Sequence, residues 1–138
     1  MAYTCSATLP TDSIGEYEKK EYTTLTYEWT FSDSGTSTSQ SGSHIFTGLV
    51  IGAPNNINGT VKVYCTETVS TREDDYDWEQ VGTNEDGTPK YDKVWDGYTS
   101  WEVSSTNAKF EVGSATTETH TIYTHPGVSE IFGDLAAE

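Results

Sequence analysis

TTLTYEWTF, residues 23–31, is the stretch that decides the fold. Large apolar side chains occupy every second position in it, and threonine or glutamate fills the positions between them. The apolar set is Leu25, Tyr27, Trp29 and Phe31. Successive side chains of a β-strand point to opposite faces of a sheet, so this period of two predicts a half-buried strand. Residues 61–69 alternate in the same way, and residues 110–112 and 119–123 do so more weakly.

Clusters of turn-forming residues separate these segments. They are SDSGTSTSQSG at 32–42, GAPNNING at 52–59 and NEDG at 84–87, all rich in Gly, Ser, Asn or Asp. Short strands divided by such turns are typical of an all-β sandwich or barrel. The sequence therefore predicts an all-β fold.

Composition and charge narrow the class of partner. The chain has 138 residues, about one domain, and only 33% are apolar, yet it contains 4 Trp, 9 Tyr and 4 Phe. We therefore expect a folded domain with a core built from rings. Asp and Glu number 22 against 7 Lys and Arg, a net charge of −15, which repels phosphate backbones and anionic lipid. Nucleic acid and membrane surfaces are excluded as partners, and no apolar run approaches the roughly 20 residues of a membrane span.

The N-terminal residues and the two cysteines bear on the compartment. MAYTC at residues 1–5 has neither the basic nor the apolar region of a secretory signal, so we expect synthesis in a cytoplasm. A reducing compartment would keep Cys5 and Cys65 as thiols. If the first strand lies opposite the 61–69 strand, the two sulfurs would instead meet across the core. Such a disulfide would stabilise the fold by roughly 4 kcal/mol in the chain-entropy model.

Residues 71–104 form a predicted hairpin with two different faces. Tyr76 and Trp78 alternate with acidic residues before the turn. After it, Tyr91, Lys93 and Trp95 alternate with Asp92, Val94 and Asp96. A two-residue turn at Asp86-Gly87 would pair Trp78 with Trp95. A four-residue loop at 84–87 would instead pair Trp78 with Lys93 and Tyr76 with Trp95. Both registers place the same five side chains on one face, because they differ by two residues.

Three interpretations of this aromatic face stay open. It extends the core of the sandwich, it docks as an arm on a neighbouring subunit, or it forms a platform for a carbohydrate. Interface centres are enriched in aromatic residues and poor in lysine, which suits the arm. The opposite face carries carboxylates that could collect Ca²⁺, although their spacing matches no EF-hand loop. We predict a solvated acidic face there, formed with Asp74, Asp75, Asp77, Asp92 and Asp96.

The sequence contains no pattern for catalysis or for a bound cofactor. His44, His120 and His125 have no zinc-ligand spacing, and no G-x-S-x-G motif is present. We therefore predict a protein that is not an enzyme and that holds neither metal nor cofactor.

The last fourteen residues, 125–138, form a predicted tail with one apolar stripe. Its members follow helical spacing: Val128, Ile131, Phe132 and Leu135. A helix this short is not stable alone in water. The stripe must therefore dock, either on its own sandwich or on a neighbouring chain, and we favour the neighbour.

Residues 27–69, about a third of the chain, resemble the immunoglobulin-like sandwich of PKD domains. In that family a strand carrying W-x-F runs into an acidic glycine turn. A short strand with an aromatic residue follows, then a strand that opens Gly-Thr. The corresponding residues here are Trp29-Thr30-Phe31-Ser32-Asp33-Ser34-Gly35, His44-Ile45-Phe46 and Gly59-Thr60-Val61-Lys62-Val63.

The resemblance implies an immunoglobulin-like β-sandwich at residues 1–124, with a protruding hairpin at 71–104. This family serves as an interaction and spacer module on cell surfaces and in the virions of tailed bacteriophages, and it has no catalytic residues. An acidic, threonine-rich chain is more similar to the phage proteins. We therefore expect a virion structural or capsid decoration protein, homo-oligomeric or lattice-bound, that binds capsid or tail subunits. The alternative is a carbohydrate-binding or adhesin module, on a virion or a cell surface.

Overall fold

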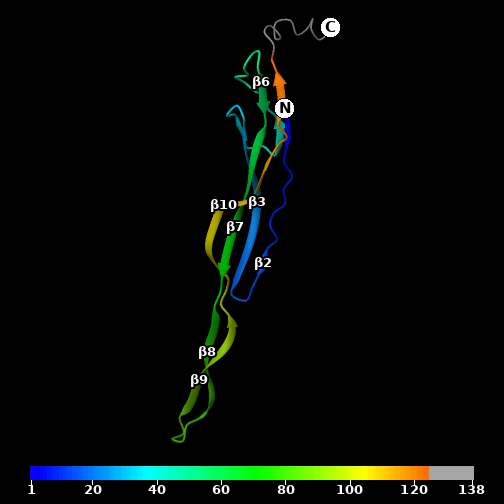
Figure 1. Ribbon diagram of the computed structural model, residues 1–138. Helices are drawn as coiled ribbons and strands as arrows, with labels where there is room; N and C mark the ends of the chain where they lie inside the picture. Colours follow the sequence, from blue (N-terminus) through cyan, green and yellow to red (C-terminus); the bar gives the residue numbers. More distant parts are fainter. Residues whose placement is uncertain (125–138) are drawn as a thin grey trace. The chain divides into compact units, whose positions relative to one another are not determined.

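The computed structural model describes residues 1–124, and every regular element in that range is a β-strand (Figure 1). Within it no helix is long and apolar enough to cross a membrane. The prediction of an all-β chain is confirmed. The predicted tail, with Val128, Ile131, Phe132 and Leu135, lies outside the described residues. The strands are β1 (Ala2–Thr4), β2 (Ser13–Ile14), β3 (Glu18–Phe31), β4 (Thr36–Ser37), β5 (Ser41–Ser43), β6 (Pro54–Ile57), β7 (Gly59–Thr71), β8 (Asp74–Thr83), β9 (Pro89–Tyr98), β10 (Glu102–Thr116) and β11 (His120–Tyr123).

The chain divides into two compact units. Among the described residues, unit 1 comprises Met1–Leu9, Thr24–Cys65 and residues 109–124; unit 2 comprises Pro10–Thr23 and Thr66–Ala108. The main sheet has the strand order β10-β7-β3-β2, with β4 also paired to β3, and β3, β7 and β10 contribute residues to both units. Two-stranded ribbons complete the topology: β1–β5, β6–β11 and β8–β9.

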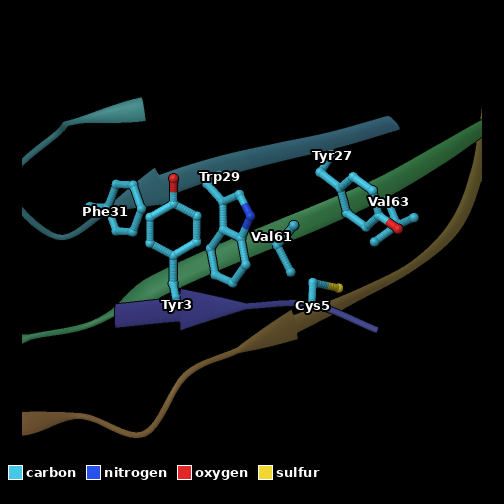
Figure 2. Packing of buried hydrophobic residues seen from close by; sticks show 7 residues of the cluster. All are labelled: Tyr3, Cys5, Tyr27, Trp29, Phe31, Val61 and Val63. Atoms are coloured by element: carbon cyan, nitrogen blue, oxygen red, sulfur yellow. The ribbon is translucent and has the colours of Figure 1, made fainter. Parts of the chain in front are cut away.

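The core of unit 1 consists mainly of aromatic rings (Figure 2). Trp29 and Phe31 of β3 are each 2% exposed, and their rings stack with centroids 5.9 Å apart. The Tyr3 ring of β1 lies 4.8 Å from Trp29 and 5.1 Å from Phe31. Alternate residues of β7 line the same core: Val61, Val63 and Cys65 are all buried. The predicted period of two is confirmed for residues 23–31 and for residues 61–65. Beyond Cys65 it fails, because residues 66–69 are all half-buried and the next buried residue is Ser70.

Two of the predicted turn clusters contain strands. Within 32–42 lie β4, which pairs with β3, and the first two residues of β5, which pairs with β1. Pro54–Ile57, inside the 52–59 cluster, forms β6 and pairs antiparallel with β11, from His120↔Ile57 to Tyr123↔Pro54. Proline is tolerated at the first position of a strand, and Ile57 is buried. Local composition favoured a turn here, but a partner strand more than sixty residues later supplies the hydrogen bonds.

A tight turn around Asp33 joins two segments of unit 1. Its carboxylate accepts hydrogen bonds from the backbone N–H of Gly35 (2.9 Å) and of Thr47 (3.1 Å), and contacts His44 Nε2 at 2.9 Å. The Asp33 side chain is only 8% exposed. The Gly35 hydrogen bond, helped by those from His44 and Thr47 and opposed by burial, lowers the pKa of Asp33 to about 2. The imidazole of His44 also stacks on Phe31, with centroids 4.0 Å apart.

We expect Asp33 to make the stability of the protein depend on acid pH. Its folded pKa lies below the unfolded value of about 4, so its stabilisation is complete above that pH and is lost as the pH falls through about 2. Asp33→Asn should therefore be less stable than wild type at pH 5, and the difference should shrink between pH 4 and 2. Urea denaturation at a series of pH values measures this difference. A difference that stays constant with pH would contradict the expectation.

Candidate functional site

The β8–β9 hairpin of unit 2 resolves the two predicted registers. Tyr76 pairs with Trp95, Trp78 with Lys93 and Gln80 with Tyr91. The register expected for the longer loop is thus confirmed, and the direct pairing of Trp78 with Trp95 is wrong. All five predicted face residues lie on one side of the ribbon, as both registers required.

The strand register of the β8–β9 hairpin shifts at two places. The register shifts by one residue between Gln80 and Gly82, so the last pair is Thr83↔Pro89 and the loop spans residues 84–88. The predicted four-residue loop at 84–87 is therefore wrong by one residue, which the shift adds. Asn84 and Thr88 close the loop through a backbone hydrogen bond of 2.8 Å, with Gly87 at φ +85°. A second shift lies between Trp95 and Tyr98, where Gly97 has φ +89°. A glycine with positive φ is typical of a bulge.

The aromatic face of the hairpin is exposed. The exposed fractions are 44% for Tyr76, 70% for Trp78, 57% for Tyr91 and 51% for Trp95. Lys93 Nζ lies 5.0 Å from the centroid of the Tyr76 ring, a cation–π contact across the strands. Among the described residues this face therefore does not extend a core, and that interpretation is wrong for this part of the chain.

The opposite face of the hairpin is acidic. Glu79 pairs directly with Asp92 across the strands. A hydrogen bond with Asp96, together with the negative charge of Asp96, raises the pKa of Asp77 above its ordinary value. Within residues 1–124 no three His, Cys, Asp or Glu side chains are grouped so that they could hold a metal ion.

Trp95 is held in place at the base of the hairpin. Asp74 accepts a hydrogen bond from Trp95 Nε1 at 3.1 Å, and both of its oxygens accept from the Tyr17 hydroxyl at 3.0 Å. The hydrogen bond to Asp74 is the main cause that raises the pKa of Tyr17 to about 12. Asp74 was predicted to belong to the solvated acidic face, but it orients a ring of the aromatic face instead.

Arg72, the single arginine of the sequence, forms the other part of this base. Its guanidinium lies 3.9 Å from the ring centroid of Tyr98 and 4.4 Å from that of Trp101. Arg72 Nε donates to the backbone oxygen of Glu16 at 2.6 Å, and the Tyr98 hydroxyl donates to the Glu16 carboxylate at 2.9 Å.

Sequence reasoning found Trp95 but missed Tyr98 and Trp101, because these three residues are spaced by three rather than two. The signal that could have indicated them is Asp96-Gly97: an extra residue at a bulge there puts Trp95 and Tyr98 within ring contact, 5.3 Å between centroids.

The remaining predicted residues lie elsewhere. Cys5 and Cys65 are buried thiols of unit 1, and Cys5 belongs to the core cluster. A disulfide between them stays a prediction.

Comparison of the chain with protein-family models, with curated proteins and with solved structures found no match. The candidate site is an exposed aromatic face whose base is fixed by Asp74, Tyr17 and Arg72.

Proposed function

We propose that this protein is a non-enzymatic structural or decoration subunit of a virion, which binds neighbouring capsid or tail subunits through the aromatic face of the β8–β9 hairpin. The observation that carries the proposal is the exposure of four rings on one face of a ribbon. Contiguous exposed apolar surface marks interaction sites, and buried aromatic residues supply much of the energy of an interface. The fixed position of Trp95 also supports it, because a rigid ring loses little conformational entropy on binding.

An immunoglobulin-like sandwich in unit 1 is part of the same proposal. The three segments that resemble the PKD pattern all contact one ring, Phe31. His44 stacks on it, Phe46 meets it edge-on at 6.0 Å, and a Cβ added to Gly59 would come within 2.8 Å of its edge. Glycine at position 59 therefore lets β7 approach β3 closely. This convergence supports the resemblance, from which the virion location is inferred.

A carbohydrate-binding or adhesin module, on a virion or a cell surface, is the second candidate. The observation that favours it is the group of Tyr17, Trp95 and Asp74, in which two half-exposed rings flank a carboxylate. Ring faces can stack on sugars, and the carboxylate could accept hydrogen bonds from sugar hydroxyls.

Electron microscopy of particles from the native source tests the proposal. We expect this chain at repeating positions, with the rings of Trp78 and Trp95 covered by a neighbouring subunit. Density for the chain with both rings facing solvent in every copy would overturn the hairpin interface. Particles that lack the chain would overturn the virion assignment itself.

A further inference from the structure

Unit 1 contains an uncharged groove that the proposed hairpin interface does not use. It consists of two hollows, of about 320 and about 190 Å³, which adjoin because Cys5, Ser6 and Ala115 line both. One wall is the segment that continues β1, and the other is the end of β10. No charged residue is among the described residues that line it, although the chain as a whole has a net charge of −15. The lining residues include Thr4–Thr8, Val61, Val63 and Val112–Thr117.

Both walls have backbone groups to offer a ligand. Among the described residues β1 pairs only with β5, and β10 is the last strand in the order β10-β7-β3-β2. Each therefore has one edge without a partner strand in that part of the chain. Such an edge is a template for pairing with another polypeptide segment.

A buried donor adjoins the smaller hollow. Trp29 lines it, and its indole Nε1 is buried with no hydrogen-bond partner among the described residues. In Figure 2 this nitrogen lies on the side of the ring that faces Val61, which lines the same hollow. Buried donors are nearly always paired in folded proteins. Because this nitrogen has almost no accessible surface, it lies beneath the groove and is not open to a ligand. The groove has an apolar floor, which suits a ligand carrying apolar side chains.

We infer that this groove receives the C-terminal segment 125–138 of a second copy of the chain. That segment lies outside the described residues, and its apolar side chains are Val128, Ile131, Phe132 and Leu135. The segment carries three carboxylate side chains, Glu130, Asp134 and Glu138. The uncharged lining can accept the segment without bringing these carboxylates close to acidic residues of the groove. This contact is independent of the hairpin face.

The course of β11 indicates a second copy rather than the same chain. Because β6 directly precedes β7, β11 prolongs the course of β10 along β6 (Figure 1). The chain therefore continues past residues 112–117, which line the groove. The seven steps from Thr117 to Thr124 cover about 23 Å at roughly 3.3 Å per residue. A tail returning to its own groove would need about seven steps again, so it would enter the groove only near Ile131 and Val128 would stay outside. The groove of another copy is not subject to this limit and can receive Val128 as well. A head-to-tail contact of this kind builds rings or open chains of subunits.

A complementation experiment on the full-length protein tests the inference. Phe132→Asp places a carboxylate in the apolar stripe of the tail and leaves the groove unchanged. Ala115→Glu places a carboxylate in the groove and leaves the tail unchanged. Ala115 is exposed, so the substitution should not unfold the chain. We expect each variant to lose self-association at least tenfold by sedimentation velocity, and an equimolar mixture to form a one-to-one heterodimer. Ala137→Asp and Ser105→Glu, which add the same charge outside the apolar stripe and the groove, should associate as wild type does.

Other outcomes would overturn the inference. The inference would be overturned if the wild-type protein stayed monomeric at protein concentrations of hundreds of micromolar. It would also be overturned if Phe132→Asp and Ala115→Glu each self-associated as the wild type does. A mixture that fails to form the heterodimer would show that the tail does not bind a second copy. If Ala115→Glu fails to fold by circular dichroism, Ser6→Glu replaces it, since Ser6 is exposed and lines both hollows. Trp78→Ala in parallel separates this contact from the hairpin: with both tail and groove intact, it should form tail-to-groove contacts normally.

Discussion

Replacing Trp29 by alanine should lower the free energy of unfolding by about 3–5 kcal/mol, the usual cost of truncating a large buried ring. Trp29 is 2% exposed and contacts the rings of Tyr3 and Phe31, so the truncation removes the centre of the core and leaves a cavity. Natural domains are stable by only about 5–15 kcal/mol. The variant should therefore unfold at a much lower urea concentration, or fail to fold at 37 °C.

Two control variants make this prediction specific. Trp29→Phe keeps a ring in the core and removes the buried N–H that has no described partner, so it should cost less than half as much as alanine. Trp78→Ala removes an equally large ring from an exposed position, and its effect should stay within about 0.5 kcal/mol. Equal losses of stability in Trp29→Ala and Trp78→Ala would contradict the assignment of Trp29 to the core.

The same Trp78→Ala variant should weaken binding to neighbouring subunits by more than tenfold. Trp78 is the most exposed ring of the hairpin face, at 70%, and it pairs with Lys93 rather than with another ring. If the face is an interface, this ring becomes desolvated on binding. Aromatic anchors of that kind commonly contribute above 2 kcal/mol, which corresponds to more than a tenfold change in Kd. Incorporation into particles, measured by co-sedimentation with increasing protein concentration, gives the affinity.

A conservative variant, the salt dependence of association and glycan binding distinguish an assembly interface from a carbohydrate-binding surface. Trp78→Phe should retain most of the affinity, because it keeps an apolar ring. Salt screens the repulsion between acidic subunits over about 10 Å at 0.1 M, so association through rings should hold or strengthen as salt rises. If Trp78→Ala and Trp95→Ala enter particles normally, the hairpin is not the assembly surface. Loss of glycan-array binding in the same variants would then favour the carbohydrate-binding alternative.

Much of the candidate site could be predicted from residues 74–98 alone. Strict alternation assigned Tyr76, Trp78, Tyr91, Lys93 and Trp95 to one face whichever loop closed the hairpin, because the two registers differ by an even number of residues. Alternation could not choose between those registers, since the choice depends on bulges that change the count by one. Nor could it find Arg72 beside Tyr98 and Trp101, or Tyr17 beside Asp74, because these contacts join segments far apart in the chain.

The sequence by itself determined the all-β class and the inward face of β3 and β7, because a period of two is a local property of an extended backbone. Only the tertiary structure decided that residues 54–57 pair as a strand, since β11 lies more than sixty residues later. It also decided that the hairpin rings are exposed, because an alternating pattern separates two faces but does not say which of them meets another layer. The groove beside Trp29 likewise arises only in the folded chain: its walls are residues 4–8 and 112–117, and packing over β7 brings them together.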